Sequence, residues 1–168
     1  MRTTKENIKV RLYLRFAFML LFALLIAALL FGGTGTFTET VGLWAFLPIP
    51  LSLLAPLLSV PNTYLCTLSL LYGGYNGILL ARSFLLVRVG AAGFFTFNAA
   101  LLLILFSLVL FLLSTAKACR FAFENPARDT ALLLKRAFLK YMAEAVLFTA
   151  LSTSLYYLWS KLLEALPL

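Results

Sequence analysis

Long, uninterrupted runs of apolar residues recur along this chain and leave few folds open to it. The runs Phe16–Phe31 and Phe94–Thr115 contain no charged residue. About 20 consecutive apolar residues are enough for an α-helix to cross a hydrocarbon core roughly 30 Å thick. Because the runs are continuous rather than alternating, they predict membrane helices and disfavour the strands of a transmembrane β-barrel.

The composition agrees with a chain that lies in a bilayer. Hydrophobic residues make up 63% of the 168 residues, charged residues make up only 12%, and the mean hydropathy is +1.01. A soluble domain carries roughly a quarter of charged residues. We therefore predict an all-α fold, a polytopic transmembrane helical bundle that forms a single integral membrane domain over residues 1–168.

Five segments have the length and composition of membrane-crossing helices. They cover residues 16–31, 41–60, 64–81, 94–115 and 141–163. The segment 41–60 admits two interpretations, because Pro48, Pro50 and Pro56 remove backbone donors and break helices. It is either a kinked crossing helix or a pair of half-helices that enters the membrane and returns. In both cases neighbouring helices have to satisfy the carbonyls that the prolines release.

The basic residues predict how the chain is oriented. The N-terminal flank 1–15 holds five of the 14 Lys and Arg residues and the segment 117–140 holds six, which leaves Arg82, Arg88 and Lys161. Basic flanks face the cytoplasm, so an even number of crossings must separate these two segments. Five crossings in all satisfy this and place the C-terminus outside. Part of the flank 1–15 is predicted to lie along the membrane surface, and 117–140 is predicted to be a water-exposed loop.

Several classes of function are disfavoured by the residues that the chain lacks. The net charge of +8 is explained by basic residues that flank the spans, so we expect no nucleic-acid partner. There is no His, and the cysteines Cys66 and Cys119 fall in a span and in the predicted loop, so we expect neither a metal site, nor a cofactor, nor a disulfide. With no His to activate a Ser or Thr and only one Asp, Asp129, we expect no enzyme.

The most informative stretch is Cys66–Arg88, a membrane-length segment that is rich in glycine. It contains Gly73, Gly74 and Gly77, with Asn76 among them. Small residues at the spacing Gly73-x-x-x-Gly77 allow another helix backbone to approach closely, and an amide in a membrane helix usually needs a protein partner. We predict that these four residues form a helix-packing or partner interface at the centre of the bundle.

Three further polar residues fall within or beside the spans and are candidates for a polar path. They are Arg82, Asn98 and Glu144. Each also has a structural interpretation: Arg82 as an anchor at the membrane interface, and Glu144 as the partner of Lys140 one helical turn earlier. We favour the structural interpretation for Glu144, and for Asn76 we favour a role in holding helices together.

The order of features from Pro48 onward resembles the bacterial stage II sporulation protein M family. The matching features are the Gly-rich segment LLYGGYNGILLARSFL, the Gly-containing break RVGAAGFF, a long apolar span, a basic loop and a final span. The resemblance covers roughly residues 48–165. It implies a non-enzymatic membrane scaffold that helps to position peptidoglycan-degrading enzymes during engulfment. The segment after the first span, Gly32–Thr40, is much shorter than the family pattern leads one to expect.

Two functions from different classes remain open at this point. The first is a scaffold in the cell membrane that recruits other membrane or cell-envelope proteins, or further copies of itself. The second is a permease or channel subunit of a multi-component transporter. Proline-broken helices beside Gly-rich ones are typical of transport sites.

Overall fold

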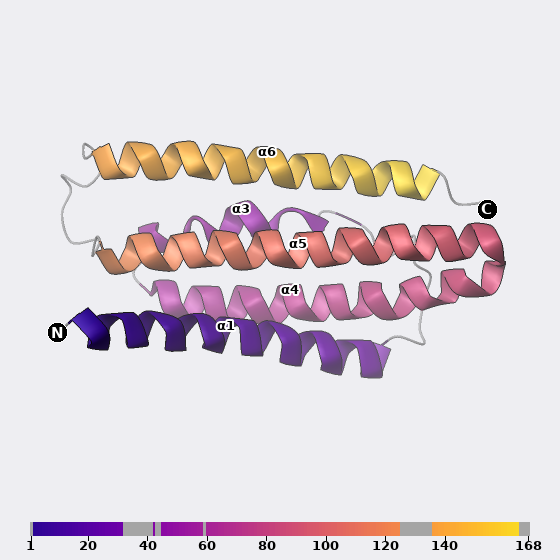
Figure 1. The fold of residues 1–168 in the computed structure, drawn as a ribbon, viewed down its shortest axis with the longest axis horizontal. Helices are drawn as coiled ribbons and strands as arrows, with labels where there is room; N and C mark the ends of the chain where they lie inside the picture. The colour runs from indigo at the N-terminus through magenta and orange to yellow at the C-terminus, as the bar shows by residue number, and fades with distance from the viewer. Residues whose placement is uncertain (1, 32–41, 43–44, 59, 125–135, 165–168) are drawn as a thin grey trace.

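The structure, a computed structural model, describes residues 2–31, 42, 45–58, 60–124 and 136–164. Every regular element in these ranges is helical, as predicted. In chain order the elements are α1 (Arg2–Phe31), α3 (Pro48–Ser52), the 3-10 helix η2 (Ala55–Leu57), α4 (Pro61–Ser83), the 3-10 helix η3 (Phe84–Val89), α5 (Ala91–Glu124) and α6 (Arg136–Glu164). The long helices α1, α4, α5 and α6 run side by side, and the short element α3 packs on α5 and α6 (Figure 1).

Among the residues that the structure describes, three stretches are long and apolar enough to cross a membrane. They are Val10–Leu30 in α1, Pro61–Arg88 in α4 and η3, and Ala91–Ala122 in α5. They contain the predicted spans 64–81 and 94–115 and all but the last residue of the predicted span 16–31. The predicted span 141–163 lies in α6, which extends along the whole bundle but is not one of the three. Glu144, Lys161 and a series of hydroxyl-bearing side chains make α6 the more polar helix.

The predicted span 41–60 is not one continuous helix. Its described part consists of the short helices α3 and η2, together an apolar stretch Pro48–Leu57 that is shorter than a membrane span. Pro48 and Pro50 stand in the first turn of α3, where a missing N–H costs nothing, and Pro56 stands in η2. The helices of this segment are broken, as the half-helix interpretation has it, but the segment does not return: it lies between the end of α1 and the start of α4, which are at opposite ends of the bundle (Figure 1).

The start of α1 and the end of α5 differ from the predictions. α1 is one unbroken helix from Arg2, so residues 2–15 continue the first span instead of forming a separate surface helix. Residues 117–124 continue α5, so the prediction of a loop from Lys117 onward is wrong there. No Gly or Pro interrupts this sequence before Asn125-Pro126, and a helix usually ends before a proline. The predicted turn 32–40 and residues 125–135 lie outside the described residues.

The order of the helices sets which parts of the chain meet at each end of the bundle. The start of α1, the end of α5 and the start of α6 lie at one end, and the ends of α1, η3 and α6 lie at the other (Figure 1). The chain reverses between η3 and α5 at Gly90, whose φ of +92° and ψ of −158° are almost exclusive to glycine. At the centre, the rings of Tyr72 and Phe111 lie 4.7 Å apart within the main cluster of buried residues.

Candidate functional site

The candidate site is the interrupted segment, which we define as residues 45–58, together with the side chains of α4, α5 and α6 that surround it. Within the segment, short-range bonds replace those of a continuous helix. The backbone N–H groups of Leu53 and Leu54 donate to the carbonyls of Pro50 and Leu51 at 3.1 Å each. Further along, Leu57 donates to the carbonyl of Leu54 at 3.0 Å. The prolines and the tight turns leave other carbonyls of the segment in need of donors.

Tyrosine side chains from the surrounding helices donate to carbonyls of the segment. The Tyr72 hydroxyl of α4 donates to the carbonyl of Ala45 at 3.3 Å, and the Tyr141 hydroxyl of α6 donates to the carbonyl of Leu53 at 2.6 Å. The hydroxyl of Tyr64, near the start of α4, donates to the carbonyl of Leu51 at 3.0 Å. Each bond joins a helix to the interrupted segment, so the segment is held from two sides.

Serine hydroxyls and one amide extend these polar contacts to α5. Ser52 of the interrupted segment and Ser114 of α5 are both fully buried, and their hydroxyl oxygens lie 2.6 Å apart. The Asn76 amide donates to the carbonyl of Tyr72 at 2.9 Å, and its oxygen accepts from the Ser107 hydroxyl at 3.3 Å. Ser107 and Ser114 also lie within hydrogen-bond distance of carbonyls of their own helix, as predicted, but each has this second partner.

The glycines of α4 face α1 of the same chain. A Cβ atom built on Gly73 would lie 2.2 Å from the carbonyl oxygen of Leu20, and one built on Gly77 would lie 2.1 Å from that of Leu24. Real Cβ atoms do not approach a carbonyl oxygen so closely, so only glycine allows this helix spacing. Gly74 is different, because its Cβ would meet only the Ala27 Cβ at 3.9 Å, an ordinary contact. The Gly73–Gly77 surface is thus occupied by α1.

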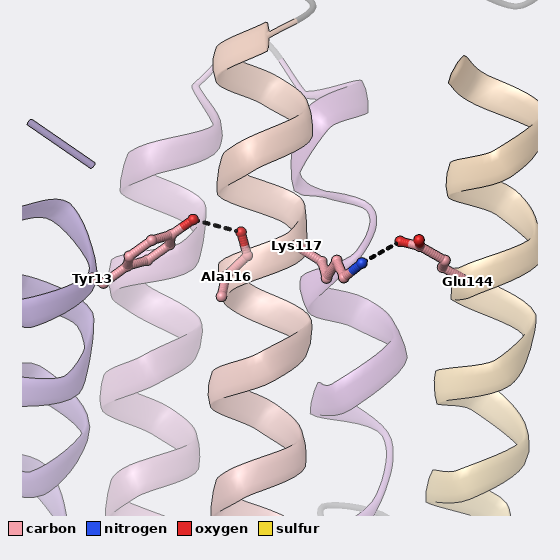
Figure 2. A network of polar contacts seen from close by, with 4 residues as sticks. All are labelled: Tyr13, Ala116, Lys117 and Glu144. Carbon is pink, nitrogen blue, oxygen red and sulfur yellow. Dashed lines mark hydrogen bonds and ion pairs between the residues drawn. The ribbon is translucent and has the colours of Figure 1, made fainter. Parts of the chain in front are cut away.

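Glu144 pairs with Lys117 of α5. Their charged atoms lie 2.9 Å apart, with 44% of the Lys117 side chain and 29% of the Glu144 side chain exposed (Figure 2). The interpretation of Glu144 as the partner of Lys140 is therefore wrong. The prediction considered only the spacing within one helix, whereas the antiparallel packing of α5 and α6 brings a lysine 27 positions earlier in the chain to the same level.

The predicted polar candidates do not converge on one site. Asn76 lies at the centre of the bundle and is 1% exposed. Arg82 is half-buried in the last turn of α4, and Asn98, near the start of α5, donates to the carbonyl of Phe94 of its own helix at 2.8 Å. Glu144 lies at the opposite end, near the start of α6. Only Asn76 adjoins the contacts around the interrupted segment.

The tyrosines and Ser52 are the site residues that sequence reasoning missed. The signal that points to them is the group of three prolines, because each proline implies a carbonyl that requires a donor from elsewhere. Which side chains act as donors depends on the register between helices, which no local pattern encodes. Among the described residues, no group of three or more Cys, Asp or Glu side chains is placed to hold a metal ion.

Compared with known proteins, the chain matches no family model, no curated protein and no solved structure.

Proposed function

We propose that this protein is a non-enzymatic scaffold of the cell membrane that crosses the bilayer five times. The observation that carries this proposal is that a group of buried side chains around the interrupted segment is bonded to the segment or to one another. The tyrosine hydroxyls bind carbonyls of the interrupted segment, and Asn76 binds Ser107. An interior whose polar groups serve its own cohesion suits a protein that acts through its outer surface.

The outer surface consists largely of apolar side chains, as expected for a chain that contacts lipid and other membrane proteins. On α6, Val146 and Leu147 are 66% and 58% exposed, and on α1 Leu29 is 76% exposed. Since Gly73 and Gly77 are covered by α1, a partner has to bind elsewhere. We propose that partners bind the outward faces of α1 and α6 or the ends of the bundle.

The proposed orientation places the start of α1 and the connection between α5 and α6 in the cytoplasm and the C-terminus outside. Arg11, in the first third of α1, stands toward the same end of the bundle as Lys117 and Arg120 near the end of α5 and Lys140 near the start of α6. A concentration of Lys and Arg at one end is the feature that orients membrane helices.

The more specific version of the proposal follows the resemblance to the stage II sporulation protein M family. In this version the partners of the protein are cell-wall hydrolases or their membrane anchors.

The experiment that tests the scaffold is a pull-down of the tagged protein from native membranes in a mild detergent. We expect a reproducible set of envelope proteins with the unmodified protein and with Gly74→Ala, which the structure accommodates. The variant Gly77→Leu places a side chain where the Leu24 carbonyl lies, so it should displace α1 and lose partners that bind there. Recovery of peptidoglycan hydrolases would support the specific version.

The second candidate is a permease or channel subunit whose energy source lies in another protein. The observation that favours it is the interrupted segment itself, because broken helices in the middle of a bundle are typical of transport sites. The same pull-down separates the two functions. Recovery of an ATPase or of further permease subunits, with no envelope enzyme, would contradict the scaffold and support the transporter.

A further inference from the structure

A small cleft lies between α1 and α5, within the stretches that are apolar enough to cross the membrane. Its volume is about 220 Å³, and its lining includes Tyr13, Leu14 and Ala17 of α1 and Leu112, Thr115 and Ala116 of α5. The exposed surface of the cleft is almost entirely apolar. In a bilayer such a hollow is filled by whatever apolar group lies next to it.

Polar contacts at the rim of the cleft indicate how deep in the membrane the cleft lies. The Tyr13 hydroxyl donates to the carbonyl of Ala116 at 3.0 Å and so joins α1 to α5 at the cleft (Figure 2). The next residue, Lys117, points away from α1 to its ion pair with Glu144. Tyrosines and snorkelling lysines are typical of the membrane–water interface. The cleft therefore lies at the level where the protein becomes charged, since Arg15 follows Leu14 in α1 and Lys117 follows Ala116 in α5.

A positive charge stands directly beyond the cleft on the same face of α5. Leu112, Ala116 and Arg120 follow one another at a spacing of four residues, so they lie along one side of the helix. Leu112 and Ala116 line the cleft, and Arg120 is exposed one turn further toward the interface. An apolar hollow with an arginine at its interfacial end is complementary to an anionic lipid, which has an apolar chain and a negatively charged phosphate.

The size of the cleft decides between a lipid and a protein segment as the occupant. A helix with its side chains is roughly 10–12 Å across, and pockets for drug-sized ligands measure about 300–1,000 Å³. A hollow of about 220 Å³ is too small for a helix or for a drug-sized ligand, and its size suits part of one flexible acyl chain. We propose that the cleft binds an acyl chain of an anionic glycerophospholipid whose phosphate contacts Arg120. This inference does not depend on the scaffold function.

The first test measures lipid retention by native mass spectrometry after reconstitution with phosphatidylglycerol or phosphatidylcholine. We expect the full-length protein to retain phosphatidylglycerol preferentially. Arg120→Gln should weaken that retention about fivefold, the factor that corresponds to roughly 1 kcal/mol for one basic residue near an anionic lipid. The matched control is Arg88→Gln, which removes an exposed arginine from η3 at the opposite end of the bundle and should leave retention unchanged.

A second variant tests the apolar part of the site. Ala17→Leu fills the cleft and should reduce the retention of phosphatidylglycerol, whereas Ala150→Leu on the exposed side of α6 should not. If Ala17→Leu fails to fold, photocrosslinking of the unmodified protein by phosphatidylglycerol with a diazirine in its acyl chain replaces it. The expected crosslinks map to residues 13–17 and 112–116 and are competed by excess phosphatidylglycerol but not by phosphatidylcholine.

Two outcomes would overturn the inference. Equal retention of the two lipids would show that Arg120 selects no headgroup. Equal losses for Arg120→Gln and Arg88→Gln would show a general attraction between a basic protein and an anionic lipid, with no site at the cleft.

Discussion

At the scale of single residues, the glycines of α4 differ in what a side chain would meet. Gly73 and Gly77 lie against carbonyl oxygens of α1, and a backbone cannot move aside as the end of a flexible side chain can. Gly74, between them in sequence, lies against the tip of Ala27. Substitution of alanine at any of the three positions therefore adds the same methyl group, and only the space that the methyl group finds differs.

We predict that Gly77→Ala lowers the free energy of unfolding by about 1–3 kcal/mol, the cost of an extra methyl group in a tightly packed site. Gly74→Ala should be neutral or slightly stabilising, because alanine favours the helix over glycine. The measurement is equilibrium unfolding in a mild detergent, followed by circular dichroism. Equal stability of the two variants would contradict the close approach of α1 and α4.

The hydroxyl of Tyr141 is the second residue-scale test. Tyr141→Phe keeps the ring, whose centroid lies 4.2 Å from that of Phe121, and removes only the donor to the carbonyl of Leu53. We expect a loss of about 1–3 kcal/mol in the free energy of unfolding, since a buried carbonyl is left without its donor. Tyr157→Phe, at a position that is 60% exposed, should change stability little and serves as the control.

At the scale of elements, the link between α5 and α6 rests partly on Lys117 and Glu144. Because both side chains are partly exposed, we expect a coupling of only about 0.2–1 kcal/mol from a double-mutant cycle of Lys117→Gln and Glu144→Gln. The matched cycle of Lys140→Gln and Glu144→Gln should show no coupling. A larger coupling energy for Lys140 than for Lys117 would contradict the contact between α5 and α6 and would support the pairing of Glu144 with Lys140 within α6.

The elements also show which features a sequence can reveal. The spans in α1, α4 and α5 were predictable because continuous apolar runs report directly on burial in lipid. The break at 48–57 was predictable as one of two alternatives, because proline acts through the backbone of its own segment. The bonds from Tyr72 and Tyr141, and the pairing of Lys117 with Glu144, were not predictable. They depend on the register of helices that are distant in the chain.

At the scale of the whole molecule, the proposed five crossings can be tested by labelling from the two sides of the membrane. In a variant with Cys66→Ala and Cys119→Ala, single cysteines are introduced as Arg11→Cys, Lys140→Cys or Lys161→Cys. We expect an impermeant maleimide to label only Lys161→Cys in intact cells, and to label all three after lysis. Labelling of Arg11→Cys but not of Lys161→Cys in intact cells would show the reverse orientation, and labelling of Arg11→Cys together with Lys161→Cys would require an even number of crossings.

The close fit of α1 against Gly73 and Gly77 has a consequence for how the protein is made. α1 is synthesised first, but the surface that receives it belongs to α4, which follows only after the interrupted segment. During translation the exposed carbonyls of Leu20 and Leu24 and the apolar sides of α1 have no protein neighbour from their own chain. The first helix therefore has to remain in contact with lipid or with the insertion machinery until α4 has been synthesised and its glycines can pack against α1.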